Sequence, residues 1–265
     1  MKISSSATLA TFLTLFFAIV LRPDSAAADP TWTDAYDGLL RTHVDEQGFV
    51  DYAAIAAEPQ VLTGYVESLA LPDALPPVDQ RDARLAALIN AYNAFTLQLI
   101  LDHWDQFESG AVSSITELHG GKPWDQDIWT LAGQTVSLNQ LEHELIRRDL
   151  LTLDGVPGAA EPRLHWAVVC AAYSCPPLRA EAYTAPQLEA QLADQERRVL
   201  LTQDPRFVQQ DGGKIGVTQL FNWYGKDFGD WKRYVTQRLE PAPAATNWYF
   251  INYDWKLNAQ SNKTP

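Results

Sequence analysis

Apolar residues recur every three or four positions along most of this 265-residue chain, a spacing that predicts amphipathic helices. The longest such pattern covers residues 79–103, where Asp79 is the expected N-cap. Asn90 and Asn93 interrupt this otherwise apolar sequence. We expect further helices over residues 32–40, 59–69, 137–148, 184–201, 218–224 and 231–239. The pattern therefore predicts that helices predominate.

Two capping boxes support the helix starts in the second half of the chain. Ser137 with Gln140 predicts the start of a helix that ends near Arg148. Thr184 with Gln187 predicts the start of another. Because these polar residues can bond to the free N–H groups of a first helical turn, both positions favour helix over loop.

Strand patterns are fewer and shorter. Residues 127–136 predict a hairpin that turns at Ala132-Gly133-Gln134, and Asp211-Gly212-Gly213 predicts a second hairpin turn. Residues 247–257 form an aromatic, strand-like segment, whereas the apolar run 163–170 is too short to assign. The expected fold class is α+β, predominantly helical with a small antiparallel sheet.

The N-terminus has the three parts of a secretory signal peptide. Lys2 precedes an apolar run over residues 7–21, which is followed by Ala26-Ala27-Ala28. This run is shorter than the ~20 residues that span a bilayer, which favours cleavage after Ala28 over an uncleaved anchor. We expect a signal peptide over residues 1–28, one globular domain over 29–258 and a disordered tail over 259–265. The expected location is periplasmic or secreted, with no integral membrane segment after cleavage.

The net charge and the number of cysteines exclude some classes of binding partner and of scaffold. Lys and Arg number 20 against 33 Asp and Glu, a formal net charge of -13. Like charges repel, so nucleic acid and anionic membranes are disfavoured as main partners. With only 2 Cys, the chain is not a disulfide-dense scaffold.

The candidate chemistry lies around those two cysteines. Cys170 and Cys175 are five positions apart, and His165 stands five positions before Cys170. A second histidine, His143, lies between Glu142 and Glu144. A thiol becomes a nucleophile when a base takes its proton and a carboxylate orients that base. The chain thus contains the parts of a Cys-His-acid triad, although sequence alone does not bring them together.

Four interpretations of this cluster remain open. The thiols can form a disulfide, or one of them can act as a nucleophile. Zinc binding by His165, Cys170 and Cys175 is less favoured, because a tight two-residue knuckle and a fourth ligand are missing. Redox exchange is the least favoured because there is no C-x-x-C motif. Arg147 stands in place of the second histidine of an H-E-x-x-H motif, so that zinc-protease motif is not present. We predict no metal and no cofactor.

Several segments in order resemble the domain of unknown function 547 family over residues 32–258. They are LAALINAYNAFTLQLIL, SLNQLEHELIR, RLHWAVVCAAYSCPPLR, AYTAPQLEAQL, FNWYGKDF and the closing YDWKLN. The resemblance implies a site built from Glu142, His143 and Arg147 on one segment and His165 and Cys170 on another. It also matches Asn90, Tyr92 and Asn93 to an I-N-x-Y-N signature that positions a loop or substrate. Ala171 stands where the family usually has glycine, and the family admits serine in place of Cys175.

This resemblance favours an exported thiol hydrolase or acyltransferase, similar in outline to papain or transglutaminase-type folds and acting on a small peptide or amide. Cys170 would attack a carbonyl group of the substrate, and His143 would take and return the proton. Glu142 would orient the His143 imidazole. Neighbouring residues on a helix point about 100° apart, so Glu144 or a distant Asp is the alternative orienter, and His165 the alternative base. The rival interpretation is a non-enzymatic envelope binding or structural module with a Cys170–Cys175 disulfide.

Overall fold

A computed structural model of the chain describes residues 30–147, 161–202, 204–239 and 247–263. The expected signal peptide lies outside the described residues. The α-helices are α1 (Pro30–His43), α2 (Tyr52–Ala57), α3 (Gln60–Leu69), α4 (Arg81–Asp102), α5 (Trp104–Glu108), α6 (Leu138–Gln140), α8 (Leu188–Leu200), α9 (Leu220–Trp223) and α10 (Trp231–Thr236). The strands are β1 (Trp129–Leu131), β2 (Gln134–Val136), β3 (Val208–Asp211), β4 (Lys214–Val217) and β5 (Asn247–Phe250). Short 3-10 helices are η1 (Ile115–Gly121), η2 (Pro123–Asp125), η4 (Pro162–Trp166), η5 (Ala185–Gln187), η6 (Gly225–Phe228) and η7 (Gln260–Asn262), and η3 (Leu141–Ile146) is a π-helix.

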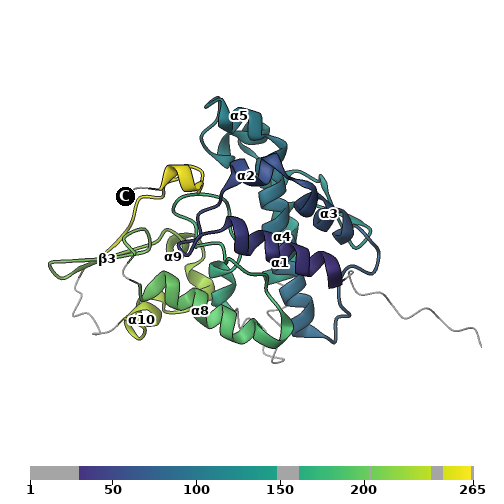
Figure 1. The fold of residues 1–265 in the computed structure, drawn as a ribbon. Coiled ribbons are helices and arrows are strands. Elements are labelled where there is room, and N and C mark those ends of the chain that lie inside the picture. The colour runs from purple at the N-terminus through teal and green to yellow at the C-terminus, as the bar shows by residue number, and fades with distance from the viewer. Residues whose placement is uncertain (1–29, 148–160, 203, 240–246, 264–265) are drawn as a thin grey trace, which may run out of the picture.

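Helix α4 runs through the middle of the larger hydrophobic core, with α3 packed beside it and α1 packed against α3 (Figure 1). It is long and apolar enough to cross a membrane, and 78% of its apolar window is buried inside the protein. The helix begins at Arg81, with Gln80 at the N-cap, so the expected cap at Asp79 is wrong. Neither this end nor its capping changes the buried face, which is set by the apolar spacing.

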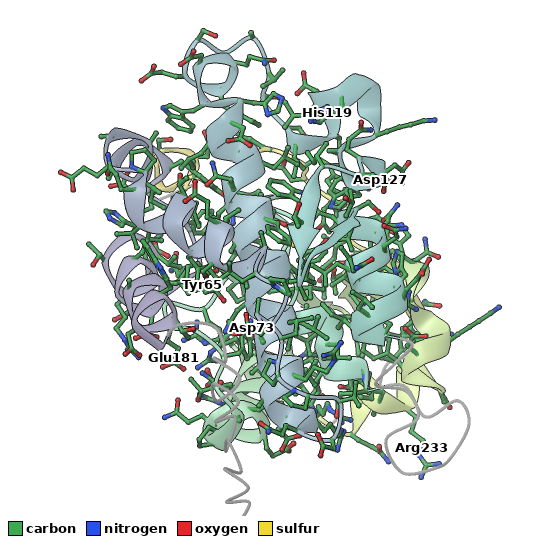
Figure 2. All side chains as sticks on the ribbon, turned by 90° about the vertical axis from the view of Figure 1, so that its right-hand side faces the viewer. Tyr65, Asp73, His119, Asp127, Glu181 and Arg233 are labelled. Carbon is green, nitrogen blue, oxygen red and sulfur yellow. The ribbon has the colours of Figure 1, made fainter. Side chains whose placement is uncertain are left out.

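Helices α1 and α3 pack closely through stacked aromatic rings and through a ring that lies against a glycine. The rings of Tyr36 and Tyr65 stack with centroids 4.3 Å apart, and Tyr65 lies among the N-terminal helices (Figure 2). The Trp32 ring fills the space where a Gly64 side chain would stand. Any larger residue at position 64 would push the helices apart.

A second, smaller core joins the three-stranded sheet β3-β4-β5 to α9, η6 and α10. Strands β3 and β4 form the expected hairpin around Gly212 and Gly213. Strand β5 ends at Phe250 and pairs parallel to β4, so this sheet is mixed, where an antiparallel one was expected. The hairpin β1-β2 is antiparallel as expected. The fold class is α+β.

The start of the helix after β2 forms the expected capping box at Ser137, but its continuation differs. From Leu141 the chain widens into the π-helix η3. At the other expected box, Thr184 makes no side-chain cap hydrogen bond, and α8 begins only at Leu188 after the turn η5. Capping spacing therefore located both helices, but it gave the correct first turn only at Ser137.

Residues 259–263, the described part of the expected disordered tail, contact the rest of the protein. The Tyr52 hydroxyl donates to the Asn258 side chain at 2.8 Å. Ala259 is buried and forms a β-bridge with Val50, and Lys263 pairs with Asp45. Residues 257–263 thus close over the segment that joins α1 to α2.

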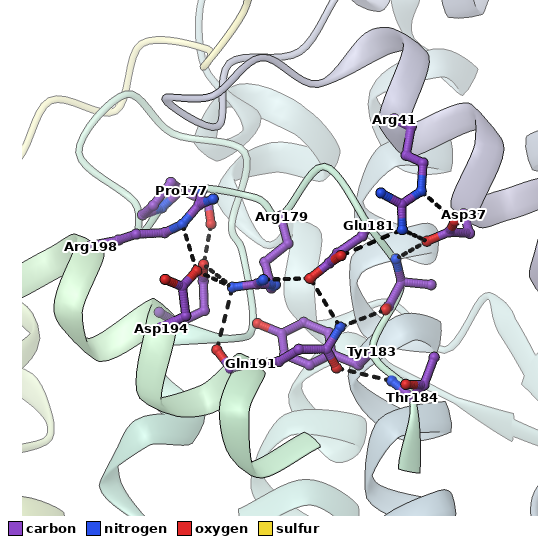
Figure 3. Close-up of polar contacts among 12 residues, drawn as sticks. Asp37, Arg41, Pro177, Arg179, Glu181, Tyr183, Thr184, Gln191, Asp194 and Arg198 are labelled. Atoms are coloured by element: carbon purple, nitrogen blue, oxygen red, sulfur yellow. Dashed lines mark hydrogen bonds and ion pairs between the residues drawn. The ribbon is translucent and has the colours of Figure 1, made fainter. Parts of the chain in front are cut away.

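A cluster of charged and amide side chains ties α8 to the loop before it; we call it the Arg179 cluster (Figure 3). The buried Arg179 guanidinium bonds to Asp194 at 2.7 Å and to Glu181 at 2.5 Å. The Gln191 amide donates to the backbone of Ala182. Burial alone would raise the pKa of Asp194, but hydrogen bonds from Arg179 and Arg197 lower it to about 2.

Candidate active site

Cys170 lies in the segment that connects the two hydrophobic cores. Trp166, at the end of η4, is buried in the smaller core, whereas Val168 and Val169 belong to the larger one. The side chain of Asn93, on α4, accepts from the Val169 N–H at 2.9 Å and donates to the Ala167 carbonyl at 3.0 Å. Helix α4 therefore fixes the backbone immediately before Cys170.

The two cysteines are free thiols in direct contact. Their sulfur atoms are 2.7 Å apart, longer than the ~2.05 Å of a disulfide bond. The Cys175 sulfur also accepts from the Cys170 backbone N–H, at 2.8 Å. The hydroxyl of Tyr253 lies 3.1 Å from the Cys170 sulfur. The Cys175 thiol and the Tyr253 hydroxyl thus both lie within hydrogen-bonding distance of the Cys170 sulfur.

The two thiols differ in acidity. Burial opposes ionisation of Cys170, but hydrogen bonds from Cys175, Tyr253 and the Ala172 backbone more than offset it and lower its pKa below the ordinary value. Burial, together with the hydrogen bond to Cys170, raises the pKa of Cys175 well above the ordinary value. Cys170 therefore ionises at a lower pH than Cys175, and the thiolate is the nucleophilic form of a cysteine.

Ala171 adopts a left-handed backbone conformation, with a φ of 58°, in a buried position. This is the position at which the sequence departs from the glycine usual in the resembling family. The conformation is compatible with alanine but costs about 1 kcal/mol. The turn lets the Ala172 backbone bond to the Cys170 sulfur, so the strain contributes to the lower pKa of the thiol.

The π-helix η3 brings Glu142 inward. Its side chain is buried and accepts from the Tyr92 hydroxyl at 3.2 Å. The hydroxyl of Tyr224, which follows α9, also hydrogen-bonds to Glu142. π-turns occur often at functional sites because they redirect side chains without ending the helix. Glu142 consequently faces the same space as Cys170.

His165 forms a hydrogen-bonded chain with two residues of other elements. Its Nε2 lies 2.8 Å from Asp227, which in turn binds Arg147 at 2.5 Å. The imidazole, with 3% of its side chain exposed, stacks on the Tyr224 ring at 4.2 Å. Hydrogen bonds from His165 and Arg147 lower the pKa of Asp227, against the effect of burial. Asp227 therefore carries the charge that orients this histidine.

His143 is placed differently from His165. Its side chain is 38% exposed, and its Nδ1 accepts from the Arg147 guanidinium at 2.8 Å. Glu142 Oε1 lies 3.7 Å from the same nitrogen, beyond ordinary hydrogen-bond length. The structure thus brings Glu142 and Cys170 to one cleft and leaves His143 outside its lining.

A cleft of about 230 Å³ opens over these groups. It lies between the two cores, and residues of both contribute to it. The lining residues are Tyr92, Trp124, Asn139, Glu142, His165, Val168, Cys170, Cys175, Pro176, Leu220, Trp223, Tyr224, Tyr253 and Trp255. The cleft therefore joins a low-pKa thiol, a carboxylate-oriented histidine and a buried carboxylate.

The remaining residues matched by the resemblance hold the structure around the cleft. Asn90 donates to the Tyr183 carbonyl at 2.9 Å and accepts from its N–H at 2.8 Å, which fixes the loop before η5. Sequence reasoning missed Asp227 and Tyr253 as site residues. Both lie in segments whose resemblance was noted, FNWYGKDF and YDWKLN, so position within those segments was the available signal. Within the described ranges, no three His, Cys, Asp or Glu side chains group as a metal site would need.

Comparison with known families agrees with the resemblance in the sequence. Residues 78–200 match the model of a family described as "Protein of unknown function, DUF547". Over these residues, the chain belongs to the DUF547 family. The match includes α4, Glu142, His165 and both cysteines, whereas Asp227 and Tyr253 lie beyond it. Comparison with curated proteins and with solved structures found no match to this DUF547 protein.

Proposed function

We propose that this DUF547 protein is an exported thiol hydrolase or acyltransferase that acts on a peptide or amide. The observation that carries the proposal is the cleft shared by Cys170, a thiol of lowered pKa, and His165, an imidazole bonded to Asp227. In this assignment Cys170 is the nucleophile, His165 the base and Asp227 the orienting carboxylate.

His165 suits the role of base better than His143. With Nε2–H donated to Asp227, the Nδ1 of His165 is the nitrogen that can accept a proton. Arg147 can only donate, so its hydrogen bond occupies the lone pair of His143 Nδ1. Glu142 bonds to two tyrosines and is assigned to the cleft wall, not to orienting the base.

The proposed reaction has two halves. The Cys170 proton passes to His165 Nδ1, and the thiolate attacks the carbonyl carbon of the substrate. As the tetrahedral intermediate collapses, the C–N bond breaks and His165 returns the proton to the leaving amine. Water, or a second amine, then attacks the thioester and frees Cys170. Asp227 stabilises the imidazolium that exists between the two proton transfers.

Acylation by p-nitrophenyl acetate, followed by intact mass and peptide mapping, tests this proposal. We expect one acetyl group on Cys170, none at this site in Cys170→Ser, and acylation slowed by about 10²-fold in His165→Gln. The matched control Cys175→Ser retains the nucleophile and a hydroxyl near its sulfur, and should still acylate. Equal, slow modification of both thiols in the folded protein would contradict the proposal.

A second candidate is a non-enzymatic envelope module in which Cys170 and Cys175 form a disulfide. The contact of the two sulfur atoms favours it, since little movement is needed to join them. Intact mass under non-reducing conditions measures the disulfide directly. A stoichiometric bond whose reduction yields no reactive thiol supports this candidate over the enzyme.

A further inference from the structure

One side of the cleft is a continuous wall of aromatic rings, which we call the Trp223 wall: Trp124, Trp223, Tyr253 and Trp255. Trp223 contacts Tyr253 at a centroid distance of 4.9 Å and stacks with Trp255 at 5.8 Å. Trp124 meets Trp255 edge-on at 5.9 Å. Trp223 is 45% exposed, so the wall faces open space on the cleft side of α9.

The charges that line the cleft are of one sign. Among the described lining residues there is no Lys or Arg, while Glu142 presents a carboxylate that is 7% exposed. Glu142 accepts hydrogen bonds from the neutral hydroxyls of Tyr92 and Tyr224, and His143 Nδ1 lies 3.7 Å from its Oε1. Arg147 lies over the Tyr224 ring at 5.0 Å and is already paired with Asp227, which also binds His165. The cleft therefore combines aromatic faces with a carboxylate that pairs with no Lys or Arg of the described residues.

We propose that this cleft binds an alkylammonium group of the substrate, held between the Trp223 wall and Glu142 and adjacent to the carbonyl that Cys170 attacks. The proposal deepens the function proposed above and names a substrate class: peptides or amides with a lysine-like side chain or a free amine next to the reacting bond. The binding part of the proposal does not need the thiol chemistry.

Ammonium fits this combination better than other ligand classes. A cation over indole faces gains from the ring quadrupole, and the gain rises where water is excluded. A neutral apolar group would cover Glu142 and leave a carboxylate desolvated without a counter-charge. An anionic group would meet Glu142 and the Cys170 thiolate. The net charge of -13 also attracts cations to the protein as a whole.

An ammonium at this place would also assist the nucleophile. The charge of Glu142 opposes ionisation of Cys170 and so raises the pKa of that thiol, against the hydrogen bonds that lower it. A bound positive charge between them would remove this opposition. The thiolate fraction should therefore increase when the substrate binds, which ties recognition to reactivity.

Binding can be measured without turnover in the Cys170→Ser variant. We expect tetramethylammonium chloride to change tryptophan fluorescence saturably, and sodium chloride at equal ionic strength not to do so. Trp223→Leu, and separately Glu142→Gln, should each weaken binding by about tenfold. Tyr249→Leu is the matched control, because Tyr249 is an exposed aromatic residue on β5 outside the cleft lining. Its binding should equal that of the parent. Absence of saturable binding would overturn the inference.

Selectivity is then measured with the full-length protein on three p-nitroanilides that differ in one side chain: Nα-acetyl-lysine, -norleucine and -glutamate. Lysine should exceed norleucine in kcat/KM by about tenfold, with glutamate lowest. Equal rates for lysine and norleucine would overturn the ammonium site and leave the thiol chemistry standing. Ammonium binding in Cys170→Ser, without turnover of any anilide by the parent protein, would support the site and count against the proposed hydrolase.

Discussion

The Arg179 cluster and the Cys170 cleft both bury charged side chains, but they satisfy them differently. Around Arg179, the guanidinium meets two carboxylates, and Gln191 binds the neighbouring backbone. Around Cys170, Glu142 accepts hydrogen bonds from two tyrosine hydroxyls, lies 3.7 Å from His143 Nδ1 and faces a cleft. The first arrangement holds α8 against the loop before it (Figure 3), whereas the second leaves charge available to a ligand.

This difference distinguishes buried charges that pair with one another from polar groups that face a cleft. Paired buried charges fix geometry, and removing one partner leaves the other desolvated. Thiols and carboxylates that face a cleft can exchange protons or bind ions. Mutations in the two regions should therefore change different measurements: stability for the Arg179 cluster and reactivity for the Cys170 cleft.

The largest expected effect on stability is that of Arg179→Met. It leaves Glu181 and Asp194 without their buried partner and should reduce the unfolding free energy by about 3 kcal/mol. Urea denaturation followed by circular dichroism measures the loss. Arg198→Met is the matched control, because its pairing with Asp194 is more exposed and should be worth under about 1 kcal/mol. A slower acylation of Cys170 in folded Arg179→Met would break the separation of the two regions.

A smaller effect concerns acid stability. The folded-state pKa of Asp194, about 2, lies below its unfolded value near 3.9. This contribution to stability is present above the unfolded pKa and is lost as pH falls through the folded pKa. Between pH 4 and 2, the unfolding free energy of Asp194→Asn should therefore fall less steeply with decreasing pH than that of the parent protein. The difference in slope should correspond to at most about one proton. An unchanged slope would mean that the Arg179 cluster does not stabilise the ionised carboxylate.

The smallest effect is expected at Ala171, beside the nucleophile. Glycine relieves the left-handed strain but loses a buried methyl group and adds freedom to the unfolded chain. The unfolding free energy of Ala171→Gly should thus stay within about 1 kcal/mol of the parent. Ala171→Val is the contrast, because a β-branched residue resists this conformation, and it should lose clearly more. Similar stability of the two variants would contradict the left-handed turn.

Local patterns in the sequence predicted much of the fold. The apolar spacing of α4 and the turn glycines of the β3-β4 hairpin depend on neighbouring residues, and both elements formed as expected. The parallel pairing of β5 depends on how the chain returns through α9 and α10, which spacing does not encode. For the same reason, the contact of Asn258 with Tyr52 was missed.

The candidate site was predictable in part. Cys170, His165 and Glu142 stand in recognisable segments, and the structure places all three on one cleft. The inward direction of Glu142 depends on a π-turn that helical spacing does not show. Asp227 comes to His165 from 62 positions away, through the packing of the smaller core. Only the tertiary structure could therefore distinguish the surroundings of His165 from those of His143.

The pH dependence of alkylation at the two thiols tests the central claim most directly. Iodoacetamide labelling, quantified by peptide mass spectrometry, gives separate rates for Cys170 and Cys175. With its pKa lowered, Cys170 should reach its maximal rate at lower pH than an ordinary thiol, while Cys175 should react only at higher pH. His165→Gln should slow labelling of Cys170 near neutral pH. Equal rates that rise together at the pH of an ordinary thiol would contradict Cys170 as the nucleophile of this protein.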